Sequence, residues 1–183
     1  MKTNTISVII LVKSFRFLTS VLKSLNSQKD CYMEVIVIMA NKYKNIVIIS
    51  DFAKITVIYK ENKLINPYII FEIMTIINGE YVAILNSYDI CREDRFSSQI
   101  KLLNENDSIQ IVSCLEKSLK GEESLCNIFI TAEDIDKAIS AYYLPLNLYT
   151  FLFRRTFLLY ISKLVTILDS CIISKKKCSY SRV

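Results

Sequence analysis

A short apolar segment that ends in a polar cluster restricts the possible folds of this chain more than any other feature. Tyr81 to Leu85 is uncharged and has the length of a strand, and Asn78-Gly79 precedes it. Such a run is typical of a fully buried strand in a parallel sheet, and a glycine there is expected to supply the positive φ of a tight turn. The polar residues Asn86 to Asp89 follow directly. Because ligands of open α/β sheets bind beyond the carboxyl ends of the strands, we expect a site at Asn86–Asp89.

Strand-like and helix-like segments alternate along the chain. Apolar runs predict strands at Ile6–Val12, Glu34–Met39, Ile55–Tyr59, Tyr81–Leu85, Ile109–Cys114, Cys126–Ile130 and Leu148–Phe153. Apolar residues at helical spacing predict helices at Phe17–Leu25, Tyr68–Ile77, Asp94–Asn104, Thr131–Tyr142 and Thr156–Leu168. The run Asn45–Ile49 fits either a strand or a buried helix.

This alternation favours one α/β domain over residues 1–183, with a central, mostly parallel sheet and helices on both faces. A single domain is the default for a chain of 183 residues, and neither a repeat nor a linker interrupts the pattern. Residues 170–183 show no clear pattern and are expected to form a loose tail.

The composition excludes several classes of site. The chain has no histidine, which rules out Ser-His and Cys-His catalysis and His-ligated zinc. Its two glycines, Gly79 and Gly121, are too few for a glycine-rich phosphate loop. The net charge is +5, but basic and aromatic residues do not interleave, so no nucleic-acid partner is expected. Six cysteines without a CxxC pair indicate reduced thiols in a cytoplasmic protein, with a Cys171–Cys178 disulfide as the alternative.

The longest apolar stretch, Leu144 to Leu168, contains Arg154, Arg155 and Lys163 and therefore does not read as a membrane-spanning helix. A core helix is the favoured interpretation. Peripheral contact with a membrane, or contact with a second protein, remains the alternative for this stretch. We therefore expect a cytoplasmic protein, with attachment to the membrane surface as the alternative.

Two parts of the chain match a known sequence pattern. Gly79–Asp89 is close to G-E-Y-I-x-F-L-D-S-D-D, and Asp94 to Gln99 continue the match into the next helix. Ile6–Ile10 is close to V-S-V-I-I. On these residues the chain resembles the family 2 glycosyltransferases, which have the GT-A fold. The resemblance covers roughly Ile6–Gln99 and extends faintly through Leu146–Arg155.

The resemblance implies a GT-A-like, Rossmann-like domain that transfers a sugar from a nucleotide-diphosphate donor to an acceptor hydroxyl. In this family, carboxylates hold Mg²⁺ or Mn²⁺, which stabilises the leaving diphosphate. A further carboxylate acts as the base that deprotonates the acceptor. The family pattern implies donor-binding residues at Asn41, Asn86, Tyr88, Asp89 and Arg155.

Several carboxylates of the family pattern are replaced in this chain. Met39–Lys42 stands where a pair of acids contacts the nucleoside. Asn86–Asp89 stands at the metal motif, which leaves Asp89 as its single candidate metal ligand, with Glu93 or Asp94 as candidate helpers from the following segment. After Arg155 the only acid is Asp169, the remaining candidate for the catalytic base.

Each candidate also has a purely structural interpretation. Asp89 is typical of a turn at a strand end, Tyr88 of a partly buried aromatic filler, and Arg154-Arg155 of a solvated pair between apolar segments. Three degraded sites together favour a degenerate, catalytically impaired or inactive member. Such a pseudoenzyme would be retained as a structural or interaction protein, with a protein partner or as a homo-oligomer. The alternative is an active transferase that binds a nucleotide-sugar at an atypical site, and a third possibility is a truncated copy without a role.

Overall fold

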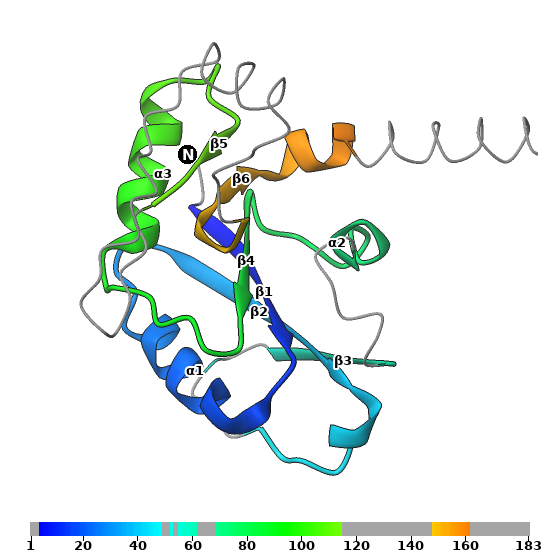
Figure 1. The fold of residues 1–183 in the computed structure, drawn as a ribbon. Coiled ribbons are helices and arrows are strands. Elements are labelled where there is room, and N and C mark those ends of the chain that lie inside the picture. Colours follow the sequence, from blue (N-terminus) through cyan, green and yellow to red (C-terminus); the bar gives the residue numbers. More distant parts are fainter. Residues whose placement is uncertain (1–3, 49–51, 53–54, 62–68, 115–147, 162–183) are drawn as a thin grey trace, which may run out of the picture.

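The computed structural model describes residues 4–48, 52, 55–61, 69–114 and 148–161. Its centre is a six-stranded mixed sheet in the order β3-β2-β1-β4-β6-β5 (Figure 1). The strands are β1 Thr5–Val12, β2 Tyr32–Ala40, β3 Ile55–Lys60, β4 Tyr81–Asn86, β5 Ile111–Val112 and β6 Leu152–Arg154. The helices are η1 Phe15–Phe17, α1 Leu18–Asn26, η2 Asn41–Tyr43, α2 Ile69–Glu72, α3 Arg95–Glu105 and η4 Leu148–Thr150, and residues 155–161 are also helical.

The sheet is parallel through its first four strands. β1 pairs in parallel with β2 and with β4, and β2 pairs in parallel with β3. β6 runs antiparallel to both β4 and β5. The prediction of an α/β domain with a mostly parallel central sheet is therefore confirmed.

Alternate residues of the central strands enter two separate cores, one on each face of the sheet. Val8 and Ile10 of β1 pack on the face that α1 and α3 cover. Ile9 and Leu11 of the same strand pack on the opposite face, against α2 and the helical residues 155–161. Figure 1 shows α1 and α3 together on one side of the sheet and α2 on the other. Strands buried on both faces carry near-continuous apolar runs, which is why the sequence pattern identified β1, β2 and β4.

The register of the strands gives the sheet two distinct edges. Leu11 of β1 lies opposite Asn86 of β4, and Val12 lies opposite Met39 of β2, so the chain leaves these strands at one common edge. We call this the carboxyl edge; it comprises residues 13–17, 41–45, 61 and 87–90, which follow β1, β2, β3 and β4. The amino edge is the opposite one, where β1, β2 and β4 begin and β6 ends (residues 4–7, 32–34, 78–81 and 154–155).

Gly79 is required at the amino edge for a reason that the sequence pattern did not reveal. Its φ lies outside the left-handed region, so the predicted positive φ is wrong. Instead, a Cβ on Gly79 would lie 2.4 Å from the backbone nitrogen of Ser7 and 2.7 Å from the carbonyl carbon of Ile6. The Gly79 N–H donates to the Ser7 hydroxyl over 2.8 Å. Only a residue without a side chain allows β4 to begin this close to β1.

Some predicted elements are shorter in the structure. Leu148–Phe153 splits into η4 and the three-residue β6, because β6 pairs with only Tyr81–Ala83 of β4 and η4 takes up the space beside the rest of that strand. The helix predicted from residue 68 has one α-helical stretch, Ile69–Glu72, followed by turns. The described part of Asn45–Ile49 forms no strand, and its Val47 is 81% exposed.

Several predictions fall on residues outside the described ranges. They concern Cys126–Ile130, Thr131–Tyr142, Asp169 and the tail 170–183. Within the described residues, none of the helices combines the length and the hydrophobicity needed to cross a lipid bilayer.

Candidate functional site

The loop after β4 is closed by its own aspartate. Asn86 is the last residue of β4 and is 5% exposed. The backbone N–H of Asn86 donates to Oδ2 of Asp89 over 2.8 Å, and the Asp89 N–H donates back to the Asn86 carbonyl over 3.3 Å. These two bonds form a compact turn of the kind that aspartate side chains stabilise. The Asp89 carboxylate therefore has a structural role in this loop.

Tyr88 projects from that turn, and a second tyrosine lies near it. The Tyr88 side chain is 57% exposed. Tyr149 of η4 is half-buried, and its burial, together with the neighbouring Tyr88 and Asp89, raises the pKa of the Tyr149 phenol. Tyr149 thus lies close to two of the candidate residues, Tyr88 and Asp89, and the sequence alone did not indicate it. It reaches β4 from a segment far along the chain, and no local pattern marks it.

Two side chains of α3 hold η4 beside the loop. The Arg95 guanidinium donates to the Tyr149 carbonyl over 2.8 Å, and Nε2 of Gln99 donates to the Thr150 carbonyl over 3.0 Å. Arg95 also donates to the Cys91 sulfur over 3.2 Å. Burial raises the pKa of the Cys91 thiol, although the nearby Arg95 opposes this effect. The loop is thus anchored by a turn at its start and by α3 at its end.

The loops after β1 and β2 touch one another at the same edge. Asn41 begins η2, and its side chain is exposed. The rings of Phe15 and Tyr43 lie 6.2 Å apart, centroid to centroid. The Lys42 ammonium lies 4.9 Å from the centroid of the Tyr43 ring, within the range of a cation–π contact. The strand register brings this pair of loops beside the turn after β4.

Four of the five candidate donor-binding residues therefore share one edge, and one does not. Asn41, Asn86, Tyr88 and Asp89 all lie at the carboxyl edge. Arg155 follows β6, and its N–H donates to the carbonyl of Glu80 over 2.9 Å, which places it at the amino edge. The length of β4 separates the two edges by about 17 Å, at about 3.3 Å per residue. Arg155 thus lies at the opposite end of the sheet from the other four residues, because β6 runs antiparallel to β4, and its role in donor binding stays a prediction.

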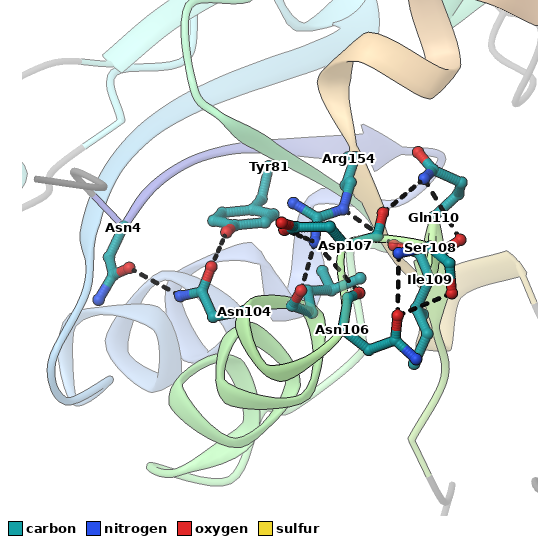
Figure 2. A network of polar contacts seen from close by, with 10 residues as sticks. Asn4, Tyr81, Asn104, Asn106, Asp107, Ser108, Ile109, Gln110 and Arg154 are labelled. Carbon is teal, nitrogen blue, oxygen red and sulfur yellow. Dashed lines mark hydrogen bonds and ion pairs between the residues drawn. The ribbon is translucent and has the colours of Figure 1, made fainter.

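Arg154, the neighbour of Arg155, closes the end of α3 (Figure 2). Its side chain is only 12% exposed, so the prediction of a solvated arginine pair does not describe it. The guanidinium donates to the carbonyls of Leu103 and Ile109, the latter over 2.8 Å, and reaches Asp107 over 3.4 Å. The last carbonyls of a helix lack partners within the helix, and arginine is a favourable donor to them. Arg154 is therefore a structural residue.

Tyr81 and two asparagines extend this polar network across the amino edge (Figure 2). The Tyr81 hydroxyl donates to Oδ1 of Asn104 over 2.8 Å, and the Asn104 amide contacts Asn4 over 3.4 Å. The network ties β1, β4 and α3 to one another. The network stabilises the amino edge, where Arg155 is the one candidate donor-binding residue among those placed.

The donor atoms at the carboxyl edge do not fit a hard divalent cation. Such ions take several oxygen ligands, preferably carboxylates, and Asp89 already accepts a backbone hydrogen bond within its turn. The nearest acids along the chain are engaged elsewhere: Glu93 pairs with Lys29 over 2.7 Å, and Asp94 pairs with Arg92 over 2.5 Å. The Arg92 guanidinium lowers the pKa of the Asp94 carboxyl. Across the described parts of the chain, no group of three or more His, Cys, Asp or Glu side chains lies together.

No family model and no curated protein matches the sequence. The crystal structure of S. aureus TarS 1–349 is similar over 82% of this chain and 47% of that one, with 18% identity and a TM-score of 0.55. The same TarS fragment in complex with UDP-GlcNAc covers 82% of this chain and 45% of that one, with 17% identity and a TM-score of 0.52. The mannosyltransferase PcManGT from Pyrobaculum calidifontis, in complex with GDP-Man and Mn²⁺, aligns over 63% of this chain and 36% of that one, with 14% identity and a TM-score of 0.48.

The present chain thus spans about half the length of TarS 1–349. At such identity the likeness concerns the fold alone. The strand order, the reversed β6 and the structural neighbours agree on one architecture. The chain has the α/β, Rossmann-like fold of the GT-A glycosyltransferases.

Proposed function

We propose that this chain is a glycosyltransferase-like domain that has lost metal-dependent sugar transfer and serves as a structural or interaction protein. The observation that supports the proposal most directly is the closed turn Asn86–Asp89, in which the single acid of the motif bonds to the backbone N–H of Asn86. Transfer from a nucleotide-sugar expels a diphosphate anion, and a carboxylate-held metal normally stabilises its developing charge. This turn contains one carboxylate, that of Asp89, and it already accepts a hydrogen bond from the Asn86 N–H.

The loop after β2 supports the same proposal. In the related family a pair of acids follows this strand and contacts the nucleoside, whereas Met39–Lys42 contains none. Asn41 is exposed here and has an amide oxygen to offer, but no negative charge. The third degraded position, the base candidate Asp169, lies outside the described residues and stays a prediction.

The test is a turnover assay. The purified chain is incubated with UDP- and GDP-linked sugars in the presence of Mn²⁺ or Mg²⁺, and released nucleoside diphosphate is measured with and without acceptor sugars. We expect no release above the rate of the protein-free control. Metal-dependent release that disappears in Asp89→Asn, while the variant remains folded, would overturn the proposal.

A double variant tests whether the missing carboxylates explain the proposed loss of metal binding. Asn86→Asp combined with Tyr88→Asp places two further acids beside Asp89. We expect Mn²⁺ to raise the melting temperature of this double variant and to leave that of the unmodified chain unchanged, since ligands stabilise only the folded state that binds them. An equal rise in both proteins would show that the native turn already holds the metal.

The second candidate is an active transferase with an atypical site. It is favoured by the grouping of Asn41, Tyr88 and Asp89 at the carboxyl edge, where ligands of such sheets bind. The same assay, repeated in EDTA, separates it from the first candidate: turnover without metal would support it.

For the interaction role, the partner is a second protein or a second copy of this chain, and sedimentation of the purified chain at several concentrations distinguishes these.

A further inference from the structure

A cavity of about 350 Å³ opens where α3 passes the residues that precede β1 and β2. Two of its lining residues, Asn4 and Asn104, belong to the polar network of the amino edge (Figure 2). None of the described residues of the carboxyl edge lines it. The cavity is therefore separate from the Asn86–Asp89 turn. Its lining residues are Asn4, Asp30, Ser97, Ser98, Ile100, Lys101 and Asn104.

Several polar groups of this lining are available to a ligand. The Asp30 carboxylate and the Ser98 hydroxyl are exposed, and neither forms a hydrogen bond with another described residue. The oxygen of the Asn4 amide accepts a hydrogen bond from Asn104 over 3.4 Å, while its nitrogen has no partner among the described residues. The cavity therefore presents acceptors and donors whose hydrogen bonds the fold does not use.

Two of the lining residues have a backbone conformation that is uncommon outside glycine. Asn4 has a φ of 45° and Asp30 a φ of 56°, and within the described residues they are the two non-glycine positions with a positive φ. Asparagine and aspartate adopt this conformation more readily than other side chains do. Residues in such conformations cluster at binding and catalytic sites. Their coincidence at one cavity supports a role in binding.

The charge of the lining restricts the class of ligand. Asp30 supplies one negative charge and Lys101 one positive charge, and the other polar groups are neutral amides and hydroxyls. A phosphate would require more cationic donors, and the Asp30 carboxylate would repel it. Amides and hydroxyls both donate and accept, so they match an uncharged ligand that carries several groups able to do the same. A saccharide, with a hydroxyl on most of its ring carbons, has this chemistry.

An exposed aromatic ring lies close to the cavity. Tyr32 is 76% exposed and follows the lining residue Asp30 by two positions. Its backbone N–H donates to the carbonyl of Asn4, another lining residue, over 3.2 Å. An aromatic ring of this kind combines an apolar face with a polar tip that stays in water. A sugar ring likewise has an apolar face of C–H groups, which can pack on the face of Tyr32.

We propose that this cavity binds a neutral saccharide of one or two sugar rings. The hydroxyls of the saccharide bond to Asp30, Asn4 and Ser98, and one ring face packs on Tyr32. The volume is that of a small-molecule site, which typically occupies about 300 to 1,000 Å³. The inference goes beyond the proposed function and does not depend on it, because the cavity lies away from the turn after β4.

The test is a titration of the ¹⁵N-labelled full chain, followed by the NMR signals of its backbone amides. The probes are mannose, N-acetylglucosamine and maltose, with glycerol as a polyol without a ring and pyrophosphate as an anion. We expect at least one of the three saccharides to shift the signals of Asn4, Asp30 and Ser97–Lys101 in a saturable manner. Glycerol and pyrophosphate are expected to leave these signals unchanged.

A pair of matched substitutions locates the site. Ser98→Phe fills the cavity from an exposed position of α3 and is expected to weaken saccharide binding by at least about tenfold. Ser20→Phe makes the same change at an exposed position of α1 that does not line the cavity, and is expected to weaken binding less than about twofold. The melting temperature checks that both variants remain folded.

A third variant tests the contribution of the carboxylate. Asp30→Asn keeps the size of the side chain and the tolerance of a positive φ, but it removes the charge. We expect it to weaken binding by about fivefold, because a charged acceptor forms a stronger hydrogen bond than a neutral one. Since the probes are uncharged, the accompanying change in net charge has no long-range effect on their affinity.

Four results would overturn the inference. They are the lack of a saturable shift with all three saccharides at millimolar concentration, shifts confined to residues away from the cavity, equal shifts with glycerol, and an equal loss of affinity in Ser20→Phe and Ser98→Phe. The proposed function is tested separately, by nucleoside diphosphate release. Saccharide binding neither requires nor excludes that release, so each proposal can fail without the other.

Discussion

The two edges of the sheet differ in what holds their polar groups. At the amino edge, the Ser7 hydroxyl donates to Glu34 and accepts from Gly79, and Glu34 accepts from the Asn78 backbone over 2.7 Å. These bonds join residues far apart in the chain. At the carboxyl edge, Asp89 exchanges two hydrogen bonds with Asn86, three residues before it, and the side chains of Lys13, Arg16, Lys42 and Lys44 are exposed. We therefore expect polar contacts at the amino edge to contribute more to the stability of the sheet than those at the carboxyl edge.

The largest expected loss of stability is at Gly79, at the amino edge. We expect Gly79→Ala to lower the free energy of unfolding by more than about 3 kcal/mol, because the new Cβ would overlap the backbone of β1 and separate the two central strands. Urea denaturation measures the effect. The control is Lys23→Ala, an exposed helical substitution expected to change stability by less than about 0.5 kcal/mol. Equal stability of the two variants would mean that β4 does not begin as close to β1 as described.

The adjacent arginines provide the next test. Arg154→Met removes the donor to the carbonyls at the end of α3 and is expected to cost about 2 to 3 kcal/mol of stability, since buried acceptors lose a charged partner. Arg155→Met is the matched control. The buried Nε of Arg155 has no hydrogen-bond partner among the described residues, so we expect a loss below about 1 kcal/mol. Thermal unfolding of both variants ranks them, and the reverse order would contradict the assigned roles.

Asp89 tests whether the carboxyl edge contributes to the fold through a local turn. Asp89→Ala removes the acceptor of the Asn86 N–H and is expected to lower the free energy of unfolding by about 1 kcal/mol, the usual size of one such bond. Asp89→Asn keeps an oxygen acceptor at this position and is expected to lose less. If both variants instead keep full stability but lose Mn²⁺-dependent nucleotide binding, Asp89 is a metal ligand rather than a turn residue.

The substitution Ser87→Ala is expected to have the smallest effect on stability, and to raise stability where the other substitutions lower it. Its side chain is 1% exposed, and its hydroxyl has no hydrogen-bond partner among the described residues. A buried hydroxyl without a partner is costly, so Ser87→Ala is expected to raise the free energy of unfolding by about 1 kcal/mol. Differential scanning calorimetry would detect the shift. A loss of stability would show that the hydroxyl is hydrogen-bonded after all.

The elements with long periodic patterns were predictable from the sequence. β1, β2 and β4 are buried on both faces and therefore read as apolar runs, while α1 and α3 show one apolar stripe each. The region around η4 and β6 was only partly predictable, because its conformation depends on β4 and α3 rather than on its own residues. Gly79 shows the same limit: its neighbour Ser7 lies 72 residues away, and no local rule reveals that contact.

The candidate site was predictable to a similar extent. The position after β4 followed from the general rule on strand ends, and Asn41, which the resemblance grouped with it, lies at the same edge; the donor-binding role of these residues stays a prediction. Arg155 was grouped with them as well, because the pattern says nothing about the direction of β6. Tyr149 was missed, since only the bond from Arg95 to its carbonyl brings it to the edge.

The position of β1 in the sheet has a consequence for the synthesis of the chain. β1 is synthesised before the other five strands of the described sheet, yet it lies in the interior of that sheet between β2 and β4. Its Ile6 pairs with Tyr81, so one side of β1 stays without its neighbour until the chain has grown past β4. A nascent chain of this kind exposes an apolar strand edge for the whole interval, and such edges attract other chains. We therefore expect the nascent chain to be especially prone to aggregation between the synthesis of β1 and that of β4.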